Sequence, residues 1–234
     1  MVGTISDWII TMEKTGLEES AKAFDSDKLQ DYERLKQSGL PTFDDFIVPF
    51  GKFQRGNKDL EEFLAKYSGF VIRAIPNTKE LPRRYKIGVY NFEDCQRFLE
   101  EHVQRENQDR YSVFLTEHEP TDWAGIIISR SKDVLIEVAQ SGLDELSHGL
   151  VIPTGGHFVQ HGQNHFRSMR YNTENVQERE LMWRVLQYLR RDLPTDSDLF
   201  PNVDFMKGYF EFVKTQKTDK IKFLDFKINE AYLK

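Results

Sequence analysis

Two hydrophobic periods alternate along the chain and predict a mixed α and β protein. In four stretches apolar residues recur every three or four positions, the period of an amphipathic helix. These stretches are about 26–38, 57–69, 91–103 and 175–192. Short apolar runs bounded by glycine, proline or polar clusters predict strands. They fall at 70–72, 86–90, 112–115, 125–129, 134–138, 150–153, 157–160, 209–214 and 221–226. An α+β class follows.

Local signals support several of these helix ends. Asn91 can cap the third helix, and Glu93 and Asp94 lie in its first turn, where acidic groups favour the helix dipole. Gly39 and Pro41 end the first helix.

A polar stretch over 104–110 predicts a connection between two lobes. We therefore expect an N-terminal extension over 1–25, a first lobe over 26–110 and a second lobe over 111–234.

Composition narrows the functional classes. The net charge of −6 argues against broad affinity for nucleic acid. No apolar run approaches the roughly 20 residues that span a bilayer, so no membrane segment is expected. The single cysteine, Cys95, excludes an intrachain disulfide and is expected in the core of a helical layer. A cytoplasmic location fits this composition.

Three histidines recur every fourth residue, at His157, His161 and His165. Nearby glycines disfavour a helix, although on a strand the same spacing also puts the histidines on one face. A metal site built from them is the less favoured alternative.

Four segments along the chain carry a family resemblance. The first is Lys28 with Gly39-Leu40-Pro41, and the second is Ile72-Arg73 followed by Pro82. The third joins Ala124-Gly125-Ile126 to a glycine- and proline-matched stretch over 142–153. The fourth is Tyr209-Phe210-Glu211 with the run 219–227. In order and spacing they resemble the nucleotide-binding domain of phosphoenolpyruvate synthase and pyruvate phosphate dikinase.

This resemblance implies an ATP-grasp-like architecture, in which two lobes hold the nucleotide in a cleft between them. The chain departs from the family pattern at several positions. Ser26 and Asp27 replace two glycines, and the serines that follow the arginine are absent after Arg73. Asp225 replaces a glutamine and Lys227 an arginine.

ATP and Mg²⁺ are the implied cofactors, and the residues offer groups that suit them. Glu211 and Asp225 lie on strands joined by a short turn, so both carboxylates can face one magnesium ion. Arg73 suits bidentate contact with phosphate and, with Lys227, is a candidate catalytic residue. Lys28 can supply a further positive charge near the phosphates.

The adenine-binding segment implied by the resemblance is Thr116 to Glu119, including Glu117, whose backbone groups would read the base edge. Plainer interpretations stay open for the charged candidates. Arg73 can be an ordinary surface ion-pair partner. Glu211 and Asp225 can simply face lysines across a hairpin.

Two functions are therefore expected. The first is an ATP-dependent phosphotransferase half, acting on a histidine of a partner protein or on a small acceptor. The second is a binding or interaction module that kept the fold and lost the chemistry. The lost glycines and serines favour the second, and the oligomeric state is left open.

Overall fold

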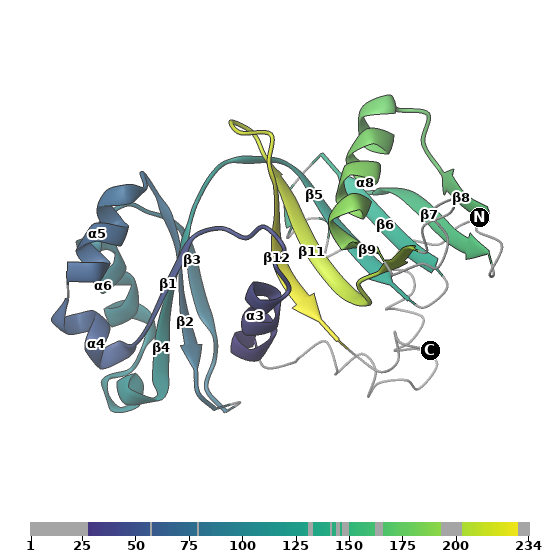
Figure 1. Ribbon diagram of the computed structural model, residues 1–234. Helices are drawn as coiled ribbons and strands as arrows, with labels where there is room; N and C mark the ends of the chain where they lie inside the picture. Colours follow the sequence, from purple (N-terminus) through teal and green to yellow (C-terminus); the bar gives the residue numbers. More distant parts are fainter. Residues whose placement is uncertain are drawn as a thin grey trace. The chain divides into compact units, whose positions relative to one another are not determined.

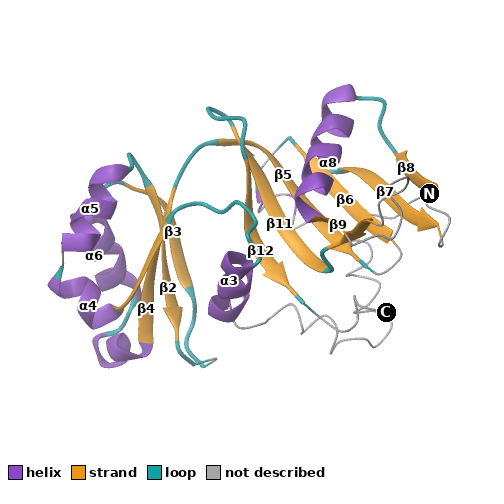
Figure 2. Ribbon diagram, in the orientation of Figure 1, coloured by secondary structure: helices purple, strands orange, loops and turns teal. Residues whose placement is uncertain are grey.

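The computed structural model describes residues 28–56, 58–78, 80–130, 133–140, 142–143, 146, 150–161, 166–192 and 203–228. The predicted N-terminal extension lies outside these residues. The chain divides into two compact units (Figures 1 and 2). We call Phe43–Pro120 the four-stranded unit, and the remainder, Met1–Thr42 with Thr121–Lys234, the six-stranded unit.

The four-stranded unit is an antiparallel sheet with helices. Its strands are β1 (Asp45–Pro49), β2 (Phe70–Pro76), β3 (Arg84–Val89) and β4 (Tyr111–Glu117). They lie in the order β1-β4-β2-β3. Its helices are α4 (Phe50–Arg55), α5 (Lys58–Lys66), α6 (Phe92–His102) and the 3₁₀ helix η1 (Arg105–Arg110). Buried residues of α4, α5 and α6 form one hydrophobic core with alternate residues of the strands, so these helices cover one face of the sheet.

The six-stranded unit is a second antiparallel sheet, in the order β12-β11-β5-β6-β7-β8. Its strands are β5 (Thr121–Ser129), β6 (Asp133–Ala139), β7 (Thr154–His161), β8 (Phe166–Tyr171), β11 (Gly208–Thr215) and β12 (Ile221–Lys227). Helices α3 (Lys28–Gln37) and α8 (Val176–Leu189) belong to this unit, as does a short pair formed by β9 (Arg190–Asp192) and β10 (Val203–Phe205).

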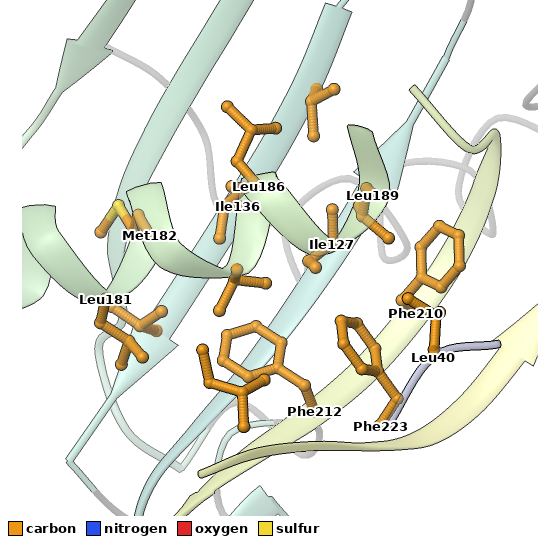
Figure 3. Close-up of a cluster of buried hydrophobic side chains, with 14 of the residues drawn as sticks. Leu40, Ile127, Ile136, Leu181, Met182, Leu186, Leu189, Phe210, Phe212 and Phe223 are labelled. Carbon is orange, nitrogen blue, oxygen red and sulfur yellow. The ribbon is translucent and has the colours of Figure 1, made fainter. Parts of the chain in front are cut away.

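One face of the six-stranded sheet forms the hydrophobic core with α8 (Figure 3), and Leu35 of α3 belongs to the same cluster. Phe210, Phe212 and Phe223 from β11 and β12 belong to one cluster with Leu186 and Leu189 of α8, and all five are fully buried. Burying each such side chain contributes about 1.5–3 kcal/mol. This packing holds β11 and β12 in place, and those two strands carry the candidate site on their other face.

Gly125 is required at the centre of this core. A Cβ atom there would lie 2.2 Å from Cζ of Phe212 and 2.8 Å from the carbonyl oxygen of Glu137. The resemblance predicted a glycine at this position, and close packing of Phe212 is its physical reason.

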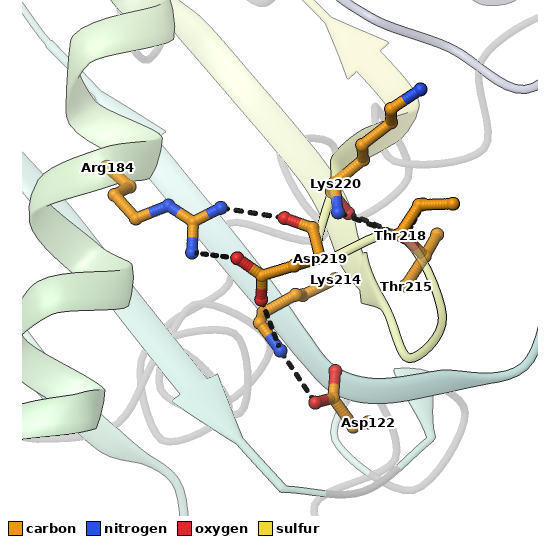
Figure 4. Close-up of polar contacts among 7 residues, drawn as sticks. All are labelled: Asp122, Arg184, Lys214, Thr215, Thr218, Asp219 and Lys220. Atoms are coloured by element: carbon orange, nitrogen blue, oxygen red, sulfur yellow. Dashed lines mark hydrogen bonds and ion pairs between the residues drawn. The ribbon is translucent and has the colours of Figure 1, made fainter.

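A polar network ties the β11–β12 turn to α8 (Figure 4). Nη1 of Arg184 donates to the Asp219 carboxylate at 2.9 Å, and Nη2 donates to the Asp219 carbonyl oxygen at 2.7 Å. Nζ of Lys214 lies 2.6 Å from the Asp122 carboxylate and 3.0 Å from that of Asp219. The hydrogen bond from Lys214, with that from Arg184, lowers the pKa of Asp219 although partial burial opposes the shift.

The predicted α+β class is confirmed, and so are the four helices in outline. Asn91 caps α6 as predicted, because its side chain accepts from the amide of Asp94 at 2.8 Å. None of the helices in the described part of the chain is long and apolar enough to span a membrane.

The two units divide at 42/43 and 120/121, whereas the predicted lobes meet at 110/111. The stretch 104–110 is largely η1, and it leads into β4, which pairs with β1 and β2 of the same sheet. The predicted strand over 150–153 does not form: Leu150 and Ile152 are 75% and 94% exposed, and Pro153 lacks an amide for a ladder.

Candidate functional site

Charged residues lie in register across the face of the six-stranded sheet opposite the core. Asp225 on β12 is directly opposite Glu211 on β11. Glu211 is opposite Ile126 on β5, and Ile126 is opposite Glu137 on β6. Residues directly opposite in a sheet point to the same face, with neighbouring strands about 4.8 Å apart. We call this surface the charged face.

A β-bulge in β12 sets the orientation of these side chains. Phe223 pairs with Phe212, whereas Asp225 pairs with Glu211, so Leu224 is the extra residue. Strict alternation would place Phe223 and Asp225 on one face. With the bulge, Phe223 faces the core while Asp225 faces the opposite side.

The charged face has a buried ion pair at its edge. Nζ of Lys227 lies 3.5 Å from the Asp225 carboxylate, and the side chains are 9% and 3% exposed. The same ammonium lies 5.5 Å from the ring centroid of Tyr209, a cation–π geometry. The Tyr209 hydroxyl donates to Glu211 at 2.8 Å. Three predicted site residues, Glu211, Asp225 and Lys227, are therefore brought together.

Gly208 allows the strands to come this close. Its φ is +145°, and a Cβ there would lie 2.7 Å from the carbonyl oxygen of Lys227. A side chain at position 208 would push β12 away from β11 at the residue that carries the ammonium.

The carboxylates fit a magnesium ion that arrives with phosphates. Among the described residues, no group of three or more His, Cys, Asp or Glu is arranged to hold a metal ion. Mg²⁺ in proteins is commonly bound by one or two carboxylates together with substrate phosphates and water. Glu211 and Asp225 match that donor set, whereas a site that binds the metal by protein groups alone would need more ligands.

A different surface lies on the four-stranded sheet, on the face away from α4, α5 and α6. Ile47, Phe114, Arg73 and Tyr85 lie directly opposite one another across β1, β4, β2 and β3. The next row on the same face includes Thr116, Val71 and Ile87. Tyr85 and Ile87 are 60% and 52% exposed. We call this surface the apolar face.

Arg73 is the charged residue at the centre of those two rows. Its Nη1 donates to Oγ1 of Thr116 at 2.8 Å, and its guanidinium carbon lies 5.5 Å from the Phe114 ring centroid. Thr116 is 7% exposed and Phe114 5% exposed. Two predicted site residues, Arg73 and Thr116, are thus brought together.

Two amides of the predicted base-reading segment already have partners. The amide of Glu117 donates to the Asp44 carbonyl, and that of His118 donates to the Gly69 carbonyl, both at 2.9 Å. Glu119 follows in the loop after β4 and is partly exposed. A base at this segment would therefore meet carbonyl oxygens rather than the amides of Glu117 and His118.

The remaining candidates are placed as follows. Lys28 is the first residue of α3, in the six-stranded unit, but its side chain lies outside the described residues. Nε2 of His157 lies 3.0 Å from the Asp133 carboxylate. The side chain of His161 and the whole of His165 lie outside the described residues, as does most of the matched stretch 142–149.

Sequence reasoning missed two residues of the charged face. Glu137 is 7% exposed and stands in the otherwise apolar run of β6. A lone acid within a buried strand is the signal that could have identified it. Tyr209 was part of the matched segment, but its hydroxyl contact with Glu211 depends on the register and was not predicted.

Comparisons with solved structures show partial likenesses. The chain is similar to D-alanyl-alanine synthetase A from Vibrio cholerae, with 10% identity and a TM-score of 0.42 over 88% of this chain and 56% of that one. It is similar to a RiPP-associated ATP-grasp ligase from Chryseobacterium gregarium, with 12% identity and a TM-score of 0.42 over 85% and 50%. A third is N5-carboxyaminoimidazole synthetase from Staphylococcus aureus, solved with ADP, with 10% identity and a TM-score of 0.40 over 86% and 43%.

The chain thus spans about half the length of these three solved structures. None of the three is a phosphoenolpyruvate synthase. No protein-family model matches the chain, and no curated protein matches it. With TM-scores near 0.4, the likenesses assign neither an activity nor a substrate to this chain.

Proposed function

We propose that this chain binds the magnesium complex of ATP and acts as an ATP-dependent phosphotransferase half. The observation that carries the proposal is the register of Glu211 with Asp225. Like charges directly opposite on neighbouring strands destabilise a sheet, and a bound cation relieves that repulsion. Lys227 offsets one of the two negative charges, which leaves the group of three with a net charge of −1.

In this proposal the charged face contacts the phosphates. Magnesium, when bound, would supply positive charge that neutralises the phosphates and the charge that develops on the transferred group. Glu211 and Asp225 would hold the ion, and Lys227 would donate directly to a phosphate oxygen.

Taken by itself, the apolar face suits a flat ring with a negatively charged group. Ile47, Val71 and Ile87 offer aliphatic surface to a flat ring, and Arg73 offers a guanidinium edge to a phosphate. Thr116 orients that guanidinium through the 2.8 Å hydrogen bond. Carbonyl oxygens of Glu117 and Glu119 would accept from the exocyclic amine of adenine.

Phosphoryl transfer would need little covalent chemistry from the protein. Positioning of the acceptor and neutralisation of the phosphates supply most of the rate enhancement in such reactions. The acceptor is proposed to be a histidine of a partner protein or a small molecule.

Calorimetry with ATP, ADP and AMP in the presence of magnesium tests the proposal. We expect affinity to fall from ATP to AMP, because Lys227 and the magnesium ion proposed at Glu211 and Asp225 would contact the phosphates. Arg73→Ala should weaken ATP binding about tenfold or more, the value of a lost charge-assisted hydrogen bond. Equal affinity for the three nucleotides, or no binding at millimolar concentration, would refute it.

A second candidate is a non-catalytic nucleotide-binding module. The Lys227–Asp225 pair favours it, because a buried ammonium already engages a carboxylate that the metal would use. Both candidates bind ATP, and γ-³²P-labelled ATP separates them. Phosphoryl release or transfer that depends on Glu211 supports the phosphotransferase, whereas binding without turnover supports the module.

A further inference from the structure

The ammonium group of Lys227 is a positive charge that the protein itself supplies on the charged face. Its ammonium lies 3.5 Å from one oxygen of Asp225, whose side chain is 3% exposed. Tyr209 holds the same ammonium over its ring at 5.5 Å. A lysine with a 9% exposed side chain and two such partners has little freedom to leave.

The formal charge of the charged face bears on how many divalent ions it favours. Glu137, Glu211 and Asp225 together carry −3, and Lys227 reduces this to −2. One divalent ion balances these four side chains, whereas a second would leave a charge of +2. Because the ammonium also occupies an edge of the Asp225 carboxylate, it competes for the oxygen that a second ion would need.

We propose that Lys227 takes the place of a second divalent cation, so that the charged face binds one metal ion per nucleotide. A lysine ammonium has three N–H donors and can contact a carboxylate and a phosphate oxygen at once. The chain therefore keeps part of its phosphate affinity when divalent metal is removed. This inference rests on the proposed nucleotide binding, and it specifies the cation requirement of that same site.

Stoichiometry of Mn²⁺ binding provides the test. Mn²⁺ prefers the same oxygen ligands as Mg²⁺, and its free fraction is measured by electron paramagnetic resonance. At saturating ATP we expect one Mn²⁺ per bound nucleotide on the native chain. Lys227→Gln removes the ammonium, and we expect its Mn²⁺ stoichiometry to rise toward two.

Two further variants separate charge from folding. Lys227→Arg keeps a positive charge and should retain one Mn²⁺ per nucleotide. Lys220→Gln removes one positive charge from the exposed β11–β12 turn and serves as the matched control. It should behave as the native chain. Circular dichroism and the denaturation midpoint report whether Lys227→Gln is folded.

Calorimetry in EDTA supplies a readout that requires no metal. The native chain should bind ATP measurably in EDTA, and Lys227→Gln should bind it about tenfold or more weakly. Two Mn²⁺ per nucleotide on the native chain, or equal affinity of native and Lys227→Gln chains in EDTA, would overturn the inference while leaving nucleotide binding intact. Absence of nucleotide binding under all conditions would instead refute the proposed function on which it rests.

Discussion

The two sheets of this protein are built alike on one side and differ on the other. Each packs one face against helices to form a hydrophobic core. The opposite face of the six-stranded sheet carries Glu211, Asp225 and Lys227, two of them almost fully buried. The opposite face of the four-stranded sheet carries aliphatic and aromatic side chains with Arg73 among them.

In the proposed function the two faces have different tasks. Buried charges cost folding free energy unless they have partners, and on this face the Lys227–Asp225 ion pair and the hydrogen bond from Tyr209 to Glu211 supply partners. Exposed Tyr85 and Ile87 beside a guanidinium suit a flat, partly apolar ligand that also carries negative charge. The predictions below test whether the two faces respond separately, from the largest expected effect to the smallest.

Substitution of Gly125 should break the six-stranded unit. In Gly125→Val the Cβ would lie 2.2 Å from the Phe212 ring and 2.8 Å from a backbone carbonyl. We expect a loss of about 3 kcal/mol or more, at the upper end of overpacking effects. Urea denaturation measures this loss. Gly51→Ala in α4, where a Cβ meets nothing within 4 Å, is the control and should gain up to about 1 kcal/mol. Native-like stability of Gly125→Val would contradict the packing described.

Removal of Asp225 from its buried ion pair with Lys227 should change both the unfolding free energy and the magnesium dependence of ATP binding. Asp225→Asn leaves the Lys227 ammonium without its carboxylate contact at a site with 9% side-chain exposure. We expect a loss of about 2 kcal/mol in urea denaturation and a loss of the magnesium dependence of ATP binding. Glu211→Gln is the comparison and should reduce the magnesium dependence with a smaller change in stability. A stable Asp225→Asn chain with unchanged magnesium dependence would contradict the account.

A substitution of Arg73 on the apolar face should weaken ATP binding without altering the magnesium dependence of that binding. Arg73→Lys keeps the charge but loses the planar fork and the hydrogen bond to Thr116. We expect ATP affinity to fall about tenfold with and without magnesium, while the unfolding free energy changes by less than about 1 kcal/mol. Calorimetry at both metal conditions measures this. If the loss appeared only with magnesium, the two faces would not act separately.

The hydrogen bonds around Asp219 should make a small, pH-dependent contribution to the free energy of unfolding. Its pKa is lowered by hydrogen bonds from Lys214 and Arg184. A carboxyl group with a lowered folded-state pKa contributes stability above its unfolded value near 3.8, and loses it as pH falls through the folded value. Because the side chain is 62% exposed, Asp219→Asn should cost at most about 1 kcal/mol at pH 7 and nearly nothing at pH 2.5. Urea titrations at the two pH values provide the measurement, and a larger cost at pH 2.5 would have the wrong sign.

Cys95 should report the integrity of the four-stranded unit. Burial, assisted by Asp94 and Glu93, raises the pKa of its thiol to about 12, so almost no thiolate exists at pH 7.5. We expect no labelling by iodoacetamide in the native chain and rapid labelling in urea, with the extent read by mass spectrometry. Fast native labelling would mean that α6 does not pack as described.

Local signals predicted much of the fold. The cap at Asn91 and the apolar periods of α5, α6 and α8 were sufficient to predict those helices. Strand β1 and helix α4 were missed because 45–55 mixes apolar residues, Pro49 and Gly51 without a clean period. The strand over 150–153 was overpredicted because apolar residues there are exposed, and sequence alone does not reveal exposure.

Only part of the candidate site could be predicted from the sequence. Glu211 and Asp225 were named from the resemblance, and the structure places them opposite each other. The bulge at Leu224 leaves no mark in the hydrophobic pattern, yet it decides which face Asp225 and Lys227 share. Register and bulges depend on packing across strands, which a single sequence does not display.

The central claim is that the charged face binds metal-complexed phosphates. It is tested most directly by the ratio of the ATP affinity with magnesium to the ATP affinity in EDTA. ATP affinity is measured by calorimetry with magnesium and in EDTA, for the native chain and for Glu211→Gln combined with Asp225→Asn. The account predicts that magnesium strengthens binding to the native chain about tenfold or more, and that the double variant shows a ratio near one. An equal magnesium effect in both chains, or no ATP binding by the native chain, would contradict it.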